Sequence, residues 1–263
     1  MSASNHRPRR RFGQHFLHDP AVVARIIEEF DPRPGQAIVE IGPGKGALTH
    51  HLMERAHEIQ AVELDRDLVS YLQATYPQGL TVHQADALNF DFCRLAPSGK
   101  RLRLIGNLPY NISTPLLFRL LDLHSCLEDM LFMLQKEVVD RLAAEPGGKD
   151  YGRLSVMVQW RCRVEQVFRV SAGSFSPPPR VESAVVRLIP YQEPPLLVRD
   201  AQRFHQLVQT AFSQRRKVLR NSLQGLMTSE TLMHLGIDPG RRAETLTLQE
   251  FAALANAVDD ETG

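Results

Sequence analysis

The chain has 263 residues, of which 43% are hydrophobic and 23% charged, values typical of an ordinary globular protein with ample material for a core. This composition excludes a largely disordered chain, and no stretch approaches the roughly 18 apolar residues of a membrane span. The formal net charge of +1 identifies no partner, but residues 1–16 contain four arginines and no acidic residue, which favours a polyanionic partner.

The three cysteines, Cys93, Cys126 and Cys162, are widely separated and include no Cys-x-x-Cys pair. This odd number and spacing indicate neither a disulfide framework nor a thiolate zinc site. The N-terminal arginines are followed by Phe-Gly-Gln-His rather than by an unbroken apolar stretch. We therefore expect a protein of the reducing cytoplasm.

Short apolar runs alternate with helix-length segments between about residues 20 and 190, a pattern that predicts βαβ units on a largely parallel sheet. The first five predicted strands are residues 37–41, 59–64, 80–83, 102–105 and 130–134. Two later runs, residues 163–170 and 183–189, follow a predicted helix at 154–160 and are joined by a Pro-rich loop, which predicts an antiparallel edge. The sequence thus predicts an α/β domain over residues 20–190 with a mostly parallel sheet of seven strands.

Residues 191–195, Tyr-Gln-Glu-Pro-Pro, interrupt this pattern and mark a predicted domain boundary. Beyond them the sequence predicts helices at residues 201–213, a basic segment at 214–223, a short piece at 230–235 and a last helix. Thr247-Leu-Gln-Glu250 is a capping box in front of that last helix. We expect residues 191–263 to form a small all-helical domain.

A glycine-rich loop, Glu40-Ile-Gly-Pro-Gly-Lys-Gly46, stands where the first predicted strand should turn into a helix. Glycines at such a turn let the backbone approach a ligand closely. Because the loop also satisfies Gly-x-Gly-x-x-Ala, it does not separate a nicotinamide dinucleotide from S-adenosylmethionine.

Two carboxylates follow the next two predicted strands. Glu63 comes about 20 residues after Gly42, where a carboxylate can accept hydrogen bonds from ribose hydroxyls. Asp86 follows the third strand on the same edge of the sheet and could accept one from an adenine amine. The alternatives are a solvated strand-end acid for Glu63 and a turn cap for Asp86.

Asn107-Leu-Pro-Tyr110 follows the fourth predicted strand and suits the methylation of an exocyclic amine. The Asn107 amide oxygen and the Pro109 carbonyl could each accept one amine N–H and direct the nitrogen lone pair at a methyl donor, while Tyr110 stacks on the base. The alternative is a turn with an aromatic anchor. Hydride transfer would instead need a proton partner near the nicotinamide, so the tetrapeptide favours S-adenosylmethionine. None of the ten histidines falls in a metal-ligand pattern, and we expect no metal.

With these features, the chain resembles the bacterial small-subunit ribosomal RNA adenine dimethyltransferases over nearly its full length. The matching stretches are residues 11–17, 40–46, 107–115, 174–181, 214–222 and 236–244. The resemblance implies a Rossmann-like S-adenosylmethionine-dependent methyltransferase domain followed by a helical RNA-binding or ribosome-binding domain. It also implies dimethylation of N6 on two adjacent adenosines near the 3′ end of 16S ribosomal RNA, by a cytoplasmic monomer that acts on an assembling small subunit.

The resemblance also implies roles for individual residues. The methyl-donor pocket would consist of His15, Leu17, Gly42, Glu63, Asp86 and Asn107, so residues 1–19 would combine a basic arm with the start of this pocket. Asn107, Pro109 and Tyr110 would handle the amine, and Phe175 would stack on the opposite face of the adenine. Position 15 is often Asn in the family. Without the resemblance to the family, Phe175 would be interpreted as an aromatic residue that anchors the core.

Four basic residues of the segment 214–223 recur at helical spacing and would form one stripe facing RNA phosphates. They are Arg215, Arg216, Lys217 and Arg220. A solvated helix face is the alternative interpretation of this charge run. For the whole chain, two other functions stay open: a non-enzymatic RNA-binding or transcription-assisting relative, against which Asn107 and Tyr110 argue, and a nicotinamide-dependent oxidoreductase.

Overall fold

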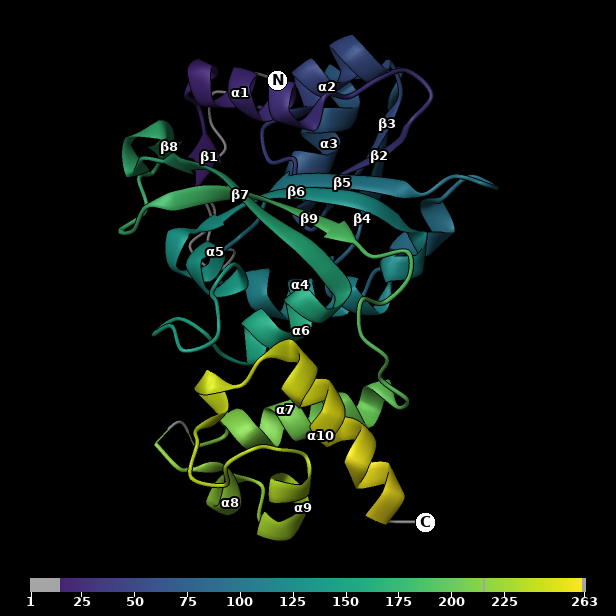
Figure 1. The fold of residues 1–263 in the computed structure, drawn as a ribbon. Helices are drawn as coiled ribbons and strands as arrows, with labels where there is room; N and C mark the ends of the chain where they lie inside the picture. The colour runs from purple at the N-terminus through teal and green to yellow at the C-terminus, as the bar shows by residue number, and fades with distance from the viewer. Residues whose placement is uncertain (1–14, 215, 262–263) are drawn as a thin grey trace. The chain divides into compact units, whose positions relative to one another are not determined.

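The computed structural model describes residues 15–214 and 216–261 (Figure 1). The basic N-terminal arm before residue 15 and the basic residue Arg215 lie outside this range. Within the described range, no helix is both long and apolar enough to cross a membrane.

The chain divides into two compact units. The first runs to Val139 and resumes with Val164–Pro190, and the second consists of Asp140–Arg163 and continues from Tyr191. Residues 140–163, which the sequence places in the domain 20–190, therefore group with the C-terminal helices. One reason is a ring contact inside the second unit, where Trp160 packs on Phe204 with centroids 4.6 Å apart.

The first unit is built on a seven-stranded sheet with the order β4-β3-β2-β5-β6-β9-β7. In chain order the strands are β2 (Ala37–Ile41), β3 (Ile59–Glu63), β4 (Leu80–Gln84), β5 (Leu102–Asn107), β6 (Leu127–Gln135), β7 (Cys162–Val170) and β9 (Ser183–Pro190). Strands β2 to β6 pair in parallel, whereas β9 is antiparallel to β6. The predicted seven-stranded, mostly parallel sheet is thus confirmed, with β9 inserted between β6 and β7.

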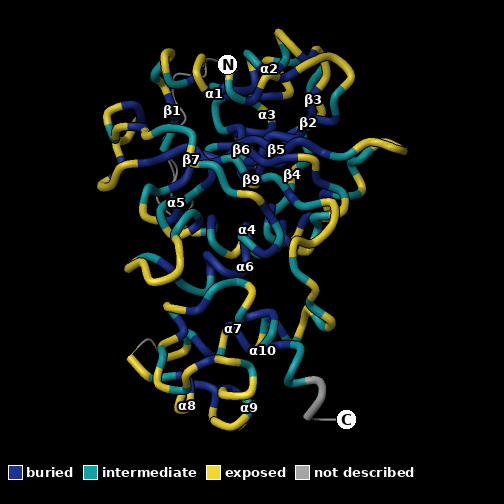
Figure 2. The backbone as a smooth tube through the Cα atoms, viewed as in Figure 1, coloured by how far each residue is buried: buried dark blue, intermediate teal, exposed yellow. Residues whose placement is uncertain are grey.

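Helices cover both faces of this sheet. They are α1 (Pro20–Phe30), α2 (Thr49–Ala56), α3 (Arg66–Thr75), α4 (Ser113–Asp122) and the beginning of α5 (Lys136–Leu142). Helices α1, α2 and α3 lie on one face and α4 on the other (Figure 1). All five residues of β2 are buried, as expected for a strand covered on both sides, and Figure 2 shows the buried backbone concentrated in the sheet.

Helix α1 shows how local sequence and packing agree. Asp19 caps it by accepting two backbone N–H groups at 3.0 and 3.4 Å, and Pro20 begins it with a preset φ. Its buried side chains recur at helical spacing: Val23, Ile26, Ile27 and Phe30. This face joins the core cluster together with residues of β2, β5, β6 and β9.

A second, two-stranded sheet lies beside the N-terminal segment. Strand β1 (Phe16–Leu17) pairs antiparallel with β8 (Phe175–Ser176), and Leu17 is opposite Phe175. The pair brings the start of the described chain next to the proline-rich loop, residues 177–182, that leads into β9.

Among its described residues, the second unit is helical apart from an isolated bridge and the first two residues of β7. The helices are α6 (Arg153–Arg161), α7 (Ala201–Phe212), α8 (Leu219–Ser222), α9 (Ser229–His234) and α10 (Leu248–Glu261). The predicted capping box of α10 is confirmed, since Thr247 Oγ1 accepts the Glu250 N–H at 3.2 Å and Glu250 accepts the Thr247 N–H at 2.8 Å.

The basic segment does not form the predicted helical stripe. Helix α8 begins only at Leu219, so Arg220 lies on it while Arg216 and Lys217 lie in a preceding turn. The backbone explains the difference: Val218 forms a bridge with Arg242, and the N–H groups of residues 219 and 220 donate to the carbonyls of residues 241 and 239. These bonds to a distant segment replace the helical ones, and the interpretation of a single helical stripe is wrong.

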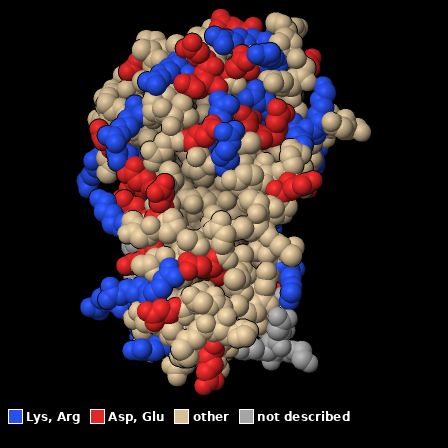
Figure 3. Space-filling view, in the orientation of Figure 1, with Lys and Arg blue, Asp and Glu red and all other residues tan. Residues whose placement is uncertain are grey.

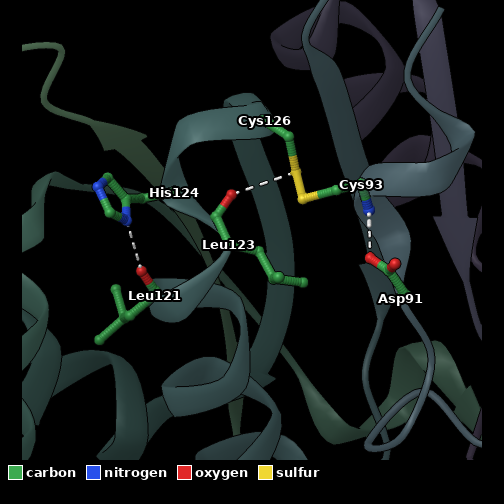
Figure 4. Close-up of a disulfide and its surroundings, with 6 residues drawn as sticks. All are labelled: Asp91, Cys93, Leu121, Leu123, His124 and Cys126. Carbon is green, nitrogen blue, oxygen red and sulfur yellow. Dashed lines mark hydrogen bonds between the residues drawn. A yellow bond between two sulfur atoms is a disulfide. The ribbon is translucent and has the colours of Figure 1, made fainter.

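Cys93 and Cys126 form a disulfide, although the number and spacing of the cysteines indicated no disulfide framework (Figure 4). Cys93 lies in a short 3-10 helix before β5 and Cys126 in another before β6, with Cα atoms 5.6 Å apart. Because β5 and β6 are adjacent and parallel, their entry ends meet, although 33 residues separate the cysteines in sequence. Cys162 is free and buried, and burial raises the pKa of its thiol to about 12.

Candidate active site

A cavity of about 310 Å³ opens at the carboxyl ends of β2, β3, β4 and β5. Parallel strands of this kind place the loops that follow them on one edge of the sheet, where ligands of such folds bind. Its volume lies at the lower end of the range of small-molecule sites. The predicted site residues that line it are His15, Leu17, Gly42, Glu63, Asp86, Asn107, Pro109 and Tyr110.

The glycine loop forms one wall of the cavity. Gly42 and Gly44 have φ angles of +67° and +60°, a left-handed conformation that residues with a Cβ rarely adopt. A Cβ on Gly44 would also lie 3.2 Å from the ring of Phe16. The loop therefore needs glycine at these positions to keep its backbone at the cavity surface.

Glu63 ties this loop to the end of β3. Its carboxylate accepts the Asp65 N–H at 2.8 Å and the Gly44 N–H at 3.3 Å. Burial raises the pKa of this carboxyl, while the two backbone donors act in the opposite direction. A carboxylate has about four acceptor positions, so Glu63 keeps capacity for ribose hydroxyls after these two bonds.

Asp86 caps a turn, as one of the two interpretations predicts, and it also lines the cavity. Its carboxylate oxygens accept the Leu88 N–H at 3.0 Å and the Asn89 side-chain amide at 3.1 Å, which caps the turn after β4. The same residue lines the cavity. Capping the turn fixes the carboxylate at the wall and leaves lone pairs for a ligand amine.

The Asn107 amide has a defined orientation. Its Nδ2 donates to the backbone carbonyl of His15 at 2.9 Å. Because that carbonyl can only accept, the NH₂ group must face it, and Oδ1 is assigned as the acceptor oxygen. The Pro109 carbonyl accepts the Ile112 N–H at 3.2 Å and retains a second lone pair. Asn107 and Pro109 thus both carry acceptors at the cavity.

Two rings lie at the end of the cavity formed by this tetrapeptide. The Tyr110 hydroxyl and Ser183 Oγ are 2.6 Å apart, and the Tyr110 ring stacks on His15 with centroids 5.5 Å apart and planes at 27°. The His15 Nδ1 donates to the Pro177 carbonyl at 2.7 Å, which assigns the proton to that nitrogen. Partial burial raises the pKa of the Tyr110 phenol.

Phe175 is not among the residues that line this cavity. Its side chain is 2% exposed and belongs to the core cluster that also contains Leu17. The structure therefore brings Tyr110, Asn107 and Pro109 together but leaves the proposed second ring within the core. Contact between Phe175 and an adenine stays a prediction, and it would need a rearrangement of the β1 and β8 pair.

Two of the cavity residues to which the sequence assigned no role bear on the chemistry of the site. Leu64 follows Glu63 and is 48% exposed although it is large and apolar, which suits contact with a flat ring. Its only sequence signal is its place directly after a strand-end acid. The other is Glu40, the acidic residue inside the buried strand β2, where a charge is costly.

Glu40 is held by a hydrogen bond from Thr49, whose Oγ1 lies 2.6 Å from Glu40 Oε2. Burial raises the pKa of Glu40 to about 8. The folded protein therefore retains this proton at pH values where the unfolded chain, with a pKa near 4.5, has lost it. The contribution of the protonated carboxyl to stability is complete below about pH 4.5 and is lost as the pH rises through about 8.

We expect Glu40→Gln to flatten the pH dependence of stability. The wild-type free energy of unfolding should fall by up to about 1.4 kcal/mol per pH unit between pH 5 and 8 because of this group, whereas the neutral amide removes that slope. Urea unfolding at pH 5, 6, 7 and 8 measures it, and the exposed Glu58→Gln serves as the control. Parallel curves for wild type and Glu40→Gln would contradict the assignment.

A family profile described as ribosomal RNA adenine dimethylase matches residues 5–260. A protein named ribosomal RNA small subunit methyltransferase A from Acinetobacter baylyi is 53% identical, with 96% of this chain and 93% of the relative covered. The protein of the same name from Nitrosococcus oceani is 54% identical, with 97% of each chain covered. The chain belongs to the ribosomal RNA adenine dimethylase family.

Solved structures agree with this membership. A dimethyladenosine transferase from Plasmodium falciparum superposes with a TM-score of 0.82 at 26% identity, covering 94% of this chain and 98% of the other. The 23S rRNA methyltransferase ErmE superposes with a TM-score of 0.69 at 27% identity, covering 93% and 99%. Both superpositions extend over nearly the full length of this chain and of each neighbour.

Proposed function

We propose that the chain transfers methyl groups from S-adenosylmethionine to N6 of two adjacent adenosines near the 3′ end of 16S ribosomal RNA, giving N6,N6-dimethyladenosines during small-subunit assembly. Family membership supports the reaction class. The observation that carries the proposal is the orientation of Asn107, whose amide nitrogen is bound by His15 so that its oxygen is the acceptor. Such an oxygen is suited to an amine N–H.

The cavity residues fit S-adenosylmethionine. The glycine loop allows close approach, Glu63 offers acceptors for ribose hydroxyls, and Asp86 offers one for an adenine amine. Leu17, Leu64, His15 and Asn107 line the same cavity. The two leucines would supply apolar wall, and His15 and Asn107 would contact the methionine half. When bound, this cofactor supplies a methyl group already activated on a sulfonium.

The protein then acts mainly by positioning. Asn107 Oδ1 and the Pro109 carbonyl accept the two N–H groups of the target amine and direct its lone pair into the cavity, while Tyr110 stacks on the base. Phe175 is proposed for the opposite face. Holding reacting atoms in line and supplying fixed dipoles can account for large accelerations. An N-methylated arylammonium is acidic, so the mechanism requires no strong side-chain base.

The proposed partner is ribosomal RNA within a partly assembled small subunit, bound by a cytoplasmic monomer without a metal. In the second unit, the helical domain from residue 191 would contact that RNA. On the face shown in Figure 3, basic and acidic side chains are interspersed. We therefore expect phosphate contacts to depend on particular residues rather than on one broad basic field on this face.

Methyl transfer from tritiated S-adenosylmethionine to small subunits isolated from cells lacking this chain tests the function. We expect incorporation at two adjacent adenosines, identified by mass spectrometry of the RNA. No incorporation with intact RNA binding would instead support a non-enzymatic relative. Calorimetric binding of NAD in preference to S-adenosylmethionine would support an oxidoreductase.

The basic segment before α8 provides a separate prediction about RNA. Replacing Arg215, Arg216 and Lys217 by alanine should weaken binding to small subunits and flatten the dependence of log K on log salt by about one unit for each phosphate that the variant no longer neutralises. Filter binding between 50 and 300 mM salt would measure the slope. A slope equal to that of the wild type would exclude these three residues as phosphate-binding residues.

A further inference from the structure

The proline-rich loop, residues 177–182, is fixed at both ends by rings of the active site. At its start, the Pro177 carbonyl accepts the hydrogen bond from His15 Nδ1 at 2.7 Å. At its end, Ser183 Oγ lies 2.6 Å from the Tyr110 hydroxyl. Since His15 and Tyr110 both line the cavity, both ends of this loop are attached to residues of its wall.

A length argument sets how far the loop can extend from these rings. Position 180 is three residues from Pro177 and three from Ser183, and a fully extended chain spans about 3.5 Å per residue. The backbone of Arg180 therefore lies within about 10 Å of each anchor. The long arginine side chain can cover much of that distance toward the mouth of the cavity.

The middle of the loop presents a cation next to an apolar side chain. Pro179 is buried and anchors the middle of the loop to the protein, whereas Arg180 and Val181 are exposed. Val181 is one of the few large apolar side chains of the described chain with substantial exposure, at 41%. A guanidinium matches a phosphate, and an exposed aliphatic group beside it matches the sugar or base attached to that phosphate.

We propose that the proline-rich loop is an RNA-binding element that holds the strand flanking the target adenosine. Arg180 contacts a phosphate next to the extruded nucleotide, and Val181 packs against the neighbouring sugar or base. This proposal rests on the proposed function, because it places the RNA strand beside the site where Asn107, Pro109 and Tyr110 receive the target base. The hydrogen bonds at both ends keep the position of the loop fixed relative to Tyr110, which stacks on the base.

Steady-state methyl transfer tests the loop, with small subunits from cells lacking this chain and tritiated S-adenosylmethionine. Arg180→Ala should raise the KM for subunits about 5- to 10-fold and reduce the salt slope by about one unit, with kcat and the affinity for S-adenosylmethionine unchanged. Arg180→Lys should keep the slope. Arg94→Ala is the matched control, since it also removes an exposed arginine. Arg94 follows the edge strand β4, whereas the proline-rich loop leads into β9, which lies next to the other edge strand, β7.

The outcomes are distinguishable from failure of the proposed function. If the wild type transfers methyl groups but Arg180→Ala matches Arg94→Ala in KM and salt slope, the loop proposal is overturned. A wild type without transfer would overturn the function itself. A photoreactive benzoylphenylalanine in place of Val181 should cross-link to RNA close to the modified adenosines, whereas cross-links confined to ribosomal proteins would overturn the RNA assignment.

Discussion

Asn107→Ala is expected to lower kcat for methyl transfer by about 10²- to 10³-fold or more, the size of effect seen when one positioned hydrogen-bonding group is removed from an active site. The reason is geometric. Without Oδ1, one amine N–H loses its acceptor, and the nitrogen lone pair returns to conjugation with the ring. The Pro109 carbonyl alone cannot hold the amine in the required orientation.

The binding steps should survive this substitution. Asn107 is partly exposed, and its removal eliminates one hydrogen bond to the His15 carbonyl rather than any part of the core. We therefore expect calorimetric affinity for S-adenosylmethionine to fall only modestly, and binding to small subunits to stay near the wild-type level.

Asn107→Asp provides a second test of the orientation argument. The carboxylate keeps an acceptor for the amine but cannot donate to the His15 carbonyl, so the hydrogen bond that fixes the side chain no longer forms. Its kcat should lie between those of wild type and Asn107→Ala. A kcat for Asn107→Ala within threefold of wild type, on subunits confirmed to be unmethylated, would contradict the mechanism.

Much of the site could be predicted from the sequence because the topology of parallel strands is regular. Once residues 37–41, 59–63, 80–84 and 102–107 are recognised as parallel strands, their carboxyl ends must meet at one edge. Gly42, Glu63, Asp86 and Asn107 follow or end these strands, and they line the same cavity.

The features that could not be predicted depend on contacts between distant segments. The acceptor for the Asn107 amide is the carbonyl of His15, 92 residues away, which nothing near Asn107 indicates. The turn around Lys217 forms because the following residues, 218–220, form backbone hydrogen bonds and a bridge with residues 239–242 instead of helical hydrogen bonds. The disulfide likewise depends on the adjacency of β5 and β6. The hydrophobic periodicity of a sequence predicts the structure of single segments, whereas these three features depend on contacts between segments in the folded protein.

At the opposite edge of the sheet from the cavity, Arg103 should be a major determinant of stability. It lies near the start of β5, is buried, and donates all five of its N–H groups. Two go to Asp129 at 2.7 and 2.9 Å, and the others go to the Phe30 and Asp31 carbonyls and the Gln36 amide oxygen. The side chain therefore connects β5 and β6 to carbonyls at the end of α1.

Arg103→Met is expected to lower the free energy of unfolding of the first unit by about 3–5 kcal/mol. Methionine retains apolar volume but leaves the buried Asp129 with the more distant Arg187, 3.6 Å away, and leaves the carbonyls of Phe30 and Asp31 without this donor. Arg33→Ala is the control, because the Arg33 and Asp31 pair is 70% and 55% exposed and should contribute little.

The measurement must report on the first unit, since the single tryptophan, Trp160, belongs to the second. Hydrogen exchange of peptides from β5 and β6 in increasing urea meets this requirement. The double variant Arg103→Met with Asp129→Leu should recover part of the stability, because it no longer buries an unbalanced carboxylate. Full recovery is not expected, because the carbonyls at the end of α1 would still lack their donor. If Arg103→Met destabilises β5 and β6 no more than Arg33→Ala does, the interaction is not a stabilising connection between the sheet and α1.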